Sequence, residues 1–209
     1  MPGTESLVAG FRAFRATYFE QRPALYEALV KEGQHPEVLM IACSDSRVDP
    51  ALLLNTQPGE LFVVRNVANL VPPYQPGSHY HGTSAALEFA VRDLQVRHAV
   101  VLGHSGCGGM RALRALRRGI RPEREFITPW VSIAAEAGEQ VEDGQSDAEA
   151  ERAMEQAALQ VSLRNLRSFP WVREREASGE LMLHAWWFDL RSGELWAHDE
   201  AVGAFVRIG

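Results

Sequence analysis

The sequence predicts an α/β fold with a mostly parallel central sheet flanked by helices, an N-terminal helical arm and a C-terminal antiparallel hairpin at the sheet edge. Two short, continuous apolar runs, at 37–42 and 98–103, are typical of strands buried on both faces of a parallel sheet. Strand-like and helical patterns alternate up to about residue 120, which is the order of an α/β fold. Residues 181–188 and 194–198 flank the turn at 191–193 and predict the hairpin.

The N-terminal segment has the periodicity of a helix. Leu7, Phe11 and Phe14 recur at helical spacing within residues 4–30. We expect one domain over residues 1–209, with a helical arm at 1–33 and an α/β core at 34–209. The arm would pack on this domain or on a partner subunit.

Capping signals mark the other helices. Asp49 is the expected N-cap of a short helix that has Pro50 at its first position. Ser146 and Glu149 have the spacing of a capping box, which predicts a long helix ending near Phe169. The remaining expected elements are a strand at 61–65, a loop at 66–82, a helix around 87–94, a helix from Met110 to a stop at Gly119, and a helix with Thr128 as N-cap that ends at Gly138.

Composition argues against several functional classes. The net charge is −6 without a basic cluster, so we expect no nucleic-acid partner. No apolar stretch approaches the roughly 20 residues of a membrane span, so we expect no membrane partner. Residues 1–14 lack the pattern of a secretory signal, which favours a cytoplasmic location. The two cysteines of such a chain are buried thiols, metal ligands or a nucleophile.

Reactive side chains follow two of the predicted strands. One strand ends in Cys43, and the other runs into the segment His104-Ser-Gly-Cys107. Neighbouring parallel strands would bring these three side chains together at one sheet edge. Two thiolates and one imidazole suit zinc, and catalytic zinc sites keep three protein ligands and one open position, where the pKa of bound water falls to about 7. The sequence therefore predicts one Zn²⁺ per subunit, held by Cys43, His104 and Cys107.

An aspartate and an arginine follow the first ligand. Asp45 is two residues beyond Cys43, and Arg47 lies on the same side of an extended segment. A charge-assisted pair would keep Asp45 ionised and in place. We expect Asp45 and Arg47 to form a catalytic dyad that orients the nucleophile at the metal.

These motifs together resemble the β-class carbonic anhydrase family. The resemblance is carried by Cys43-Ser-Asp-Ser-Arg47, by the later Gly103-His-Ser-x-Cys-Gly-Gly109, and by the intervening 57–71. It is dense over 34–110 and looser in the C-terminal hairpin. It implies a zinc enzyme that reversibly hydrates carbon dioxide to bicarbonate and a proton.

The resemblance also implies a substrate pocket beside the metal. By position, the pocket residues would be Gln34, Phe62, Val67, Phe89 and Gly108. Gln34 would donate a hydrogen bond to a substrate oxygen, and the apolar side chains would keep the slot dry. Family members form dimers that are often joined into tetramers, so we expect a homo-oligomer in which Gln34 and Phe62 face a partner's zinc.

Some choices stay open. Members that close the site by moving the aspartate onto zinc bind bicarbonate in a separate pocket with an arginine, matched here by Arg65, and a tryptophan three residues before the first cysteine ligand. This chain has Met40 at the tryptophan position, so we expect an open site. His79 and His81 are candidate proton carriers, although surface histidines are the more common case. The alternatives are a hydrolase of carbon disulfide or carbonyl sulfide on the same fold, a non-catalytic zinc module and a dithiol redox protein. The dyad argues against the zinc module, and the missing C-x-x-C argues against the redox protein.

Overall fold

The computed structural model describes residues 3–77, 80–120, 124–140 and 144–209. It divides into two compact units, Met1–His35 and Pro36–Gly209, and each is described by itself. No helix within the described ranges is long and apolar enough to cross a membrane.

The first unit is helical, as the periodicity predicted, but not continuously so. Helix α1 spans Thr4–Arg15, a π-helical segment follows at Ala16–Gln21, and α2 spans Pro23–Glu32. The break lies at Arg22, because the residue before a proline is pushed out of the helical region (φ −134°, ψ 53°). Several apolar side chains of this unit are largely exposed: Leu7, Val8, Phe11, Phe19 and Val30.

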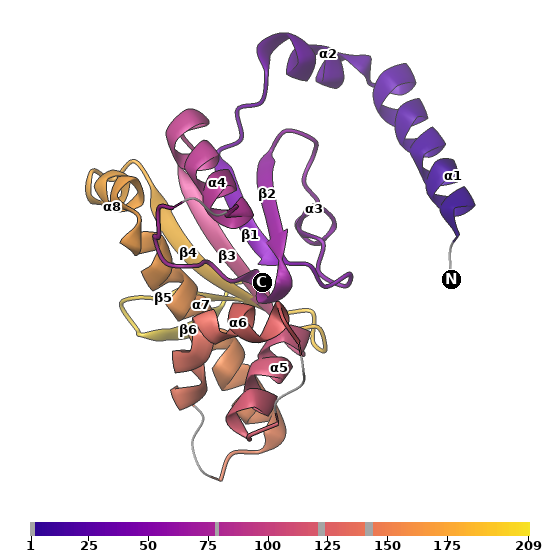
Figure 1. Ribbon diagram of the computed structural model, residues 1–209. Helices are drawn as coiled ribbons and strands as arrows, with labels where there is room; N and C mark the ends of the chain where they lie inside the picture. Colours follow the sequence, from indigo (N-terminus) through magenta and orange to yellow (C-terminus); the bar gives the residue numbers. More distant parts are fainter. Residues whose placement is uncertain (1–2, 78–79, 121–123, 141–143) are drawn as a thin grey trace. The chain divides into compact units, whose positions relative to one another are not determined.

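The second unit contains a six-stranded sheet with the order β2-β1-β3-β4-β5-β6 (Figure 1). The parallel strands are β1 (Val38–Cys43), β2 (Leu61–Asn66), β3 (His98–His104) and β4 (Met182–Phe188). Strands β5 (Leu195–Asp199) and β6 (Ala204–Arg207) add to β4 in antiparallel fashion. The predicted parallel sheet with an antiparallel hairpin at its edge is confirmed, and β6 is an additional strand.

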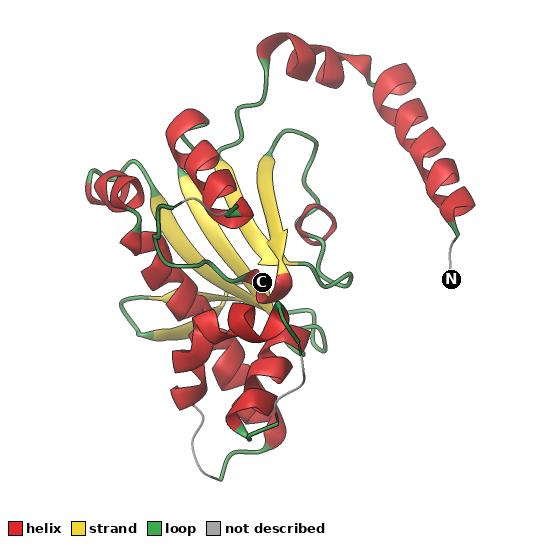
Figure 2. Ribbon diagram, viewed as in Figure 1, coloured by secondary structure: helices red, strands yellow, loops and turns green. Residues whose placement is uncertain are grey.

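Helices surround this sheet, with α5 and α6 beyond the carboxyl ends of its strands (Figure 2). They are α3 (Pro50–Leu53), α4 (Gly82–Glu88) with a π-helical extension at Phe89–Asp93, α5 (Gly108–Arg117), α6 (Ile127–Val131) with a 3-10 extension at Ser132–Gln140, α7 (Asp147–Ser168) and α8 (Pro170–Ala177). One apolar cluster joins β1 and β3 to α4, α7 and α8, and a second joins the sheet's carboxyl edge to α5, α6 and α7.

The caps test the helix predictions. The Asp49 side chain accepts from the N–H groups of Ala51 and Leu52, and Ser146 forms the predicted capping box with Glu149. The expectation that Thr128 caps a helix is wrong, because α6 already begins at Ile127 and its N-cap is Phe126. The predicted loop at 66–82 contains a 3-10 turn at Val67–Asn69, in which Ala68 has φ +66°.

Candidate metal centre

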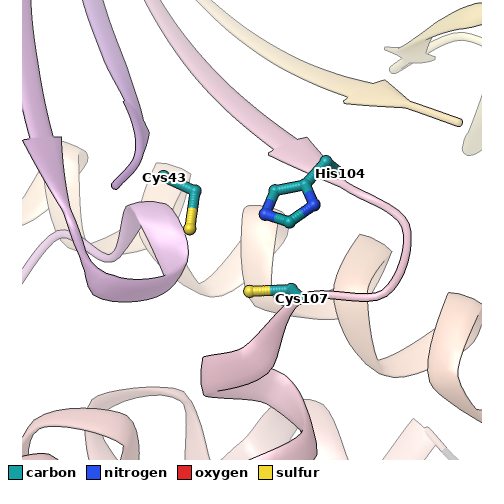
Figure 3. Close-up of side chains that lie close together, drawn as sticks. All are labelled: Cys43, His104 and Cys107. Atoms are coloured by element: carbon teal, nitrogen blue, oxygen red, sulfur yellow. The ribbon is translucent and has the colours of Figure 1, made fainter. Parts of the chain in front are cut away.

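Three potential ligands meet at the carboxyl edge of the sheet. Strands β1 and β3 are paired, so the Cys43 and His104 at their ends are neighbours. Cys107 follows one tight turn later, as the N-cap of α5. The sulfur atoms and an imidazole nitrogen all lie within 4.8 Å of one another, and the three residues are buried (Figure 3). The convergence inferred from the sequence is therefore present.

His104 directs a ring nitrogen with a free lone pair toward the two sulfur atoms. Its Nδ1 lies 3.0 Å from the carbonyl oxygen of Ser105, so Nδ1 carries the proton and Nε2 keeps its lone pair. Nε2 is buried and has no hydrogen-bond partner among the described residues. A buried nitrogen without a partner costs stability unless it binds something, and a metal ion satisfies it.

The two thiols prepare the same site for a cation. The pKa of Cys43 is lowered to about 4, mainly because the Cys107 thiol donates a hydrogen bond to its sulfur. The pKa of Cys107 is raised, because it is the donor in that bond and because it is buried. Cysteine binds zinc as the thiolate, so binding would release the proton that the two sulfurs share. Two sulfurs and an imidazole lone pair are soft and borderline donors, which fit Zn²⁺.

Asp45 and Arg47 form the predicted pair. Arg47 donates from Nε to Asp45 Oδ1 at 2.9 Å and from Nη2 to Oδ2 at 2.7 Å, and its backbone N–H also reaches Oδ1 at 3.0 Å. These bonds from Arg47 hold the pKa of Asp45 well below its usual range. Oδ2 lies 4.0 Å from His104 Nε2, so an ionised carboxylate stands at the edge of the ligand cluster.

Arg65 holds the loop that carries this dyad. Its guanidinium donates to the carbonyl oxygens of Cys43 at 2.9 Å and Asp45 at 2.7 Å, and it pairs with Asp49 at 2.8 Å. The segment from the first ligand to the start of α3 is thus fixed from β2. The positioning role of Arg65 was not inferred from the sequence, because a strand arginine carries no signal of what it contacts.

The turn between the other two ligands is also fixed. Ser105 Oγ donates to Asp189 Oδ1 at 3.0 Å and accepts from the N–H of Leu190 at 2.8 Å, which joins the turn to the end of β4. Gly106 has φ +67°, a conformation that glycine adopts without strain. The hydroxyl of Ser105 is thus engaged in two structural hydrogen bonds.

Only part of the expected substrate pocket lies near this cluster within one chain. Gly108 directly follows Cys107. Val67 packs against the start of α5, since a Cβ added at Gly109 would lie 3.1 Å from Val67 Cγ1. The rings of Phe62 and Phe89 pack together with centroids 5.8 Å apart.

Strand register separates that ring pair from the metal ligands. Phe62 is opposite Leu39, whereas Cys43 is opposite Asn66. This places Phe62 roughly 13 Å further back along the strands, at about 3.3 Å per residue. Gln34 belongs to the first unit, which is described by itself. The pocket assignments therefore stay predictions. Of the two candidate proton carriers, His79 lies outside the described residues.

The donor set and the fold together define a class of protein. Three protein ligands with a carboxylate beside them, at the carboxyl edge of a parallel sheet, are typical of a catalytic zinc site, whereas structural zinc sites have four protein ligands.

Known proteins of this class resemble the chain closely. The carbonic anhydrase family profile matches residues 38–195. "Beta carbonic anhydrase 3" of Arabidopsis thaliana is 39% identical over 205 residues, covering 95% of this chain and 79% of the relative. A carbonic anhydrase of Synechocystis sp. is 36% identical over 205 residues, covering 97% and 73%.

Solved structures agree. The β-carbonic anhydrase CcaA superposes with a TM-score of 0.89 at 33% identity, covering 99% of this chain and 92% of that one. The Coccomyxa β-carbonic anhydrase in complex with acetazolamide gives 0.80 at 28% identity, covering 100% and 94%. The chain belongs to the β-carbonic anhydrase family, zinc enzymes that hydrate carbon dioxide reversibly to bicarbonate and a proton.

Proposed function

We propose that this chain hydrates carbon dioxide at the Cys43, His104 and Cys107 centre, with Asp45 orienting the nucleophile and Arg47 holding Asp45. The observation that carries the proposal is the bidentate Arg47 pair, which leaves Asp45 ionised 4.0 Å from His104 Nε2. When Zn²⁺ is bound by such a ligand set, it lowers the pKa of a water molecule to about 7 and so supplies a nucleophile at neutral pH.

The hydrogen bonds of Asp45 define its role. Oδ1 accepts two N–H groups of Arg47, whereas Oδ2 accepts one and is the oxygen nearer His104. An ionised carboxylate only accepts, so the remaining lone pairs of Oδ2 can take a hydrogen bond from an O–H group at the metal. Such a bond would direct the lone pair of the nucleophile toward the carbon atom of carbon dioxide.

The open form of the site is part of the proposal. Asp45 is bonded to Arg47, and the guanidinium of Arg65 is already engaged by two carbonyl oxygens and Asp49. Bicarbonate beside Arg65 would have to break these bonds. A crystal structure at low pH with bicarbonate there and Asp45 on the metal would contradict the open form.

We propose further that the substrate slot is completed in a homo-oligomer, with Val67 and Gly108 from one chain and Phe62, Phe89 and Gln34 from a partner. The proposal is supported by the distance along the strands that separates Phe62 from its own ligands, and by the exposed apolar side chains of α1 and α2. Related β-carbonic anhydrases of Sordaria macrospora are tetrameric. The cytoplasmic location stays a prediction.

Stopped-flow hydration of carbon dioxide, run beside zinc analysis, tests the assignment. Asp45→Asn should keep its zinc and lose roughly 10²- to 10⁴-fold in kcat/KM, because the amide adds a donor where an acceptor is needed. Asp147→Asn is the matched control, since that exposed aspartate pairs with Arg114 at the start of α7. Full zinc with undiminished turnover in Asp45→Asn would remove the assigned role.

The same assay addresses the alternatives. Zinc-loaded wild-type protein with no hydration at any pH would point to a zinc-stabilised binding module. Hydrolysis of carbonyl sulfide in preference to hydration of carbon dioxide would favour the related hydrolase, although the relatives described above are carbonic anhydrases.

A further inference from the structure

A buried glutamate lies directly behind the ligand turn. Glu155 projects from α7 and is 4% exposed, although its neighbours on that face are the apolar Met154, Ala158 and Leu159. Burying a carboxyl group is costly unless each oxygen is hydrogen-bonded. A polar side chain at such a position therefore needs partners inside the protein.

Both oxygens of Glu155 have a partner. Oε1 accepts the backbone N–H of Cys107 at 3.0 Å, and Oε2 accepts the indole N–H of Trp187 at 3.1 Å. The first bond ends on a metal ligand, and the second ends on β4. One side chain thus connects the third ligand to the strand that pairs with β3.

The bond to Cys107 holds one end of a peptide group whose other end, the Gly106 carbonyl, accepts from Arg47 Nη2 at 3.3 Å. Cys107 is the N-cap of α5, it has no side-chain cap of its own, and it follows Gly106 in a left-handed conformation. On its other side, Gly109 packs against Val67 and Ala68. Glu155 is the side chain that fixes the N–H of Cys107, and thereby the direction in which its sulfur leaves the backbone.

We propose that Glu155 is a positioning residue for the metal centre, holding Cys107 in place through its backbone N–H so that the three donor atoms are arranged for Zn²⁺ before the ion binds. The proposal rests on the metal role assigned above to Cys107. Hydrogen bonds behind metal ligands of this kind tune the affinity of a site.

Glu155→Gln is the direct test. Glutamine has one acceptor oxygen, whereas the site holds two donors, the N–H groups of Cys107 and Trp187. One of these donors would therefore face the amide N–H groups of the glutamine. Competition with a chromophoric chelator should show zinc affinity falling by roughly 10- to 100-fold. The absorption bands of the Co²⁺-substituted protein should also shift, because they report the thiolate geometry and not catalysis.

Glu151→Gln is the matched control. It removes the same charge from the same helix, four positions earlier, where the side chain pairs with Arg114 at 3.6 Å in place of the Cys107 N–H. Its zinc affinity and Co²⁺ spectrum should match those of the wild type. If Asp45→Asn keeps full turnover while Glu155→Gln still lowers zinc affinity, the catalytic role proposed for Asp45 is wrong and the positioning role of Glu155 stands.

Melting experiments separate positioning from general packing. Positioning predicts that Glu155→Gln reduces the rise in Tm caused by zinc, whereas a packing defect lowers the Tm of the apo and zinc-loaded protein equally. Glu155→Asp, whose shorter side chain cannot reach both donors, serves if the amide variant fails to fold. Wild-type zinc affinity in a folded variant, an equal Tm loss with and without zinc, or failure of both variants to fold in excess zinc would overturn the proposal.

Discussion

Two adjacent glycines at the start of α5 offer a sharp test of how tightly the metal centre is packed. A Cβ added at Gly109 would lie 2.7 Å from the Cβ of Ala68 and 3.1 Å from Val67 Cγ1, whereas one added at Gly108 meets none of the described residues within 4 Å. Ala68 cannot move away freely, because its backbone already has φ +66° and the preceding carbonyl accepts the indole N–H of Trp130 at 2.7 Å.

The expected magnitude follows from these contacts. Forcing an extra methyl group into a packed site costs roughly 1–3 kcal/mol. Alanine is favoured over glycine in helices by about 1 kcal/mol, and that gain applies to both positions, so it cancels in the difference between the two variants. For a chain of this size, about 1 kcal/mol shifts Tm by roughly 2–4 °C. Gly109→Ala should therefore melt roughly 2–12 °C below Gly108→Ala.

Differential scanning calorimetry of both variants and the wild type is the assay. Protein and zinc concentrations must be equal, because bound metal and any self-association both shift Tm. We expect the Tm of Gly108→Ala to equal or slightly exceed that of the wild type. Equal melting of the two variants would refute the reasoning, since it would mean that the 3-10 turn at Val67–Asn69 yields to a methyl group without cost.

Three other perturbations have definite outcomes. Removing zinc with a chelator should abolish hydration of carbon dioxide and lower Tm, and added Zn²⁺ should restore both; an unchanged Tm would contradict the buried three-ligand site. Ser105→Ala should lower Tm by several degrees, because it removes one hydrogen bond to Asp189 and leaves the N–H of Leu190 without its partner, whereas Ser178→Ala on an exposed helix end should not. Ser146→Ala should lower Tm by roughly 2–4 °C at neutral pH. Hydrogen bonds from Ser146 lower the pKa of Glu149, so this capping contribution is present above the ordinary glutamate pKa and is lost as pH falls through the lowered value. The Tm difference should shrink in acid, and a constant difference would count against the capping box.

Much of the metal centre could be predicted because its residues stand at strand ends. A buried parallel strand is recognisable as an apolar run, and the first polar residues after it must lie at the sheet's carboxyl edge. Cys43 and His104 were found in this way, and Asp49 and Ser146 were found from the local chemistry of helix caps.

Other features depend on contacts between distant segments, which leave weak local signals. Glu155 interrupts an apolar stripe at a spacing of four from Leu159, a detectable irregularity, but nothing in that spacing names Cys107 as its partner. Thr128-Pro129 resembles a helix start, yet α6 begins one residue before Thr128. Strand β6 is short and half-exposed, so it lacks the apolar run that identifies the central strands.

The parallel pairing of β1 with β3 has a consequence for how the enzyme acquires its metal. An unfolded chain offers only His104 and Cys107 as near neighbours in sequence, and Cys43 is separated from them by the whole crossover through β2 and α4. We therefore expect tight capture of zinc to follow closure of that long crossover, so that metal loading comes late in maturation and favours chains whose central strands have already paired.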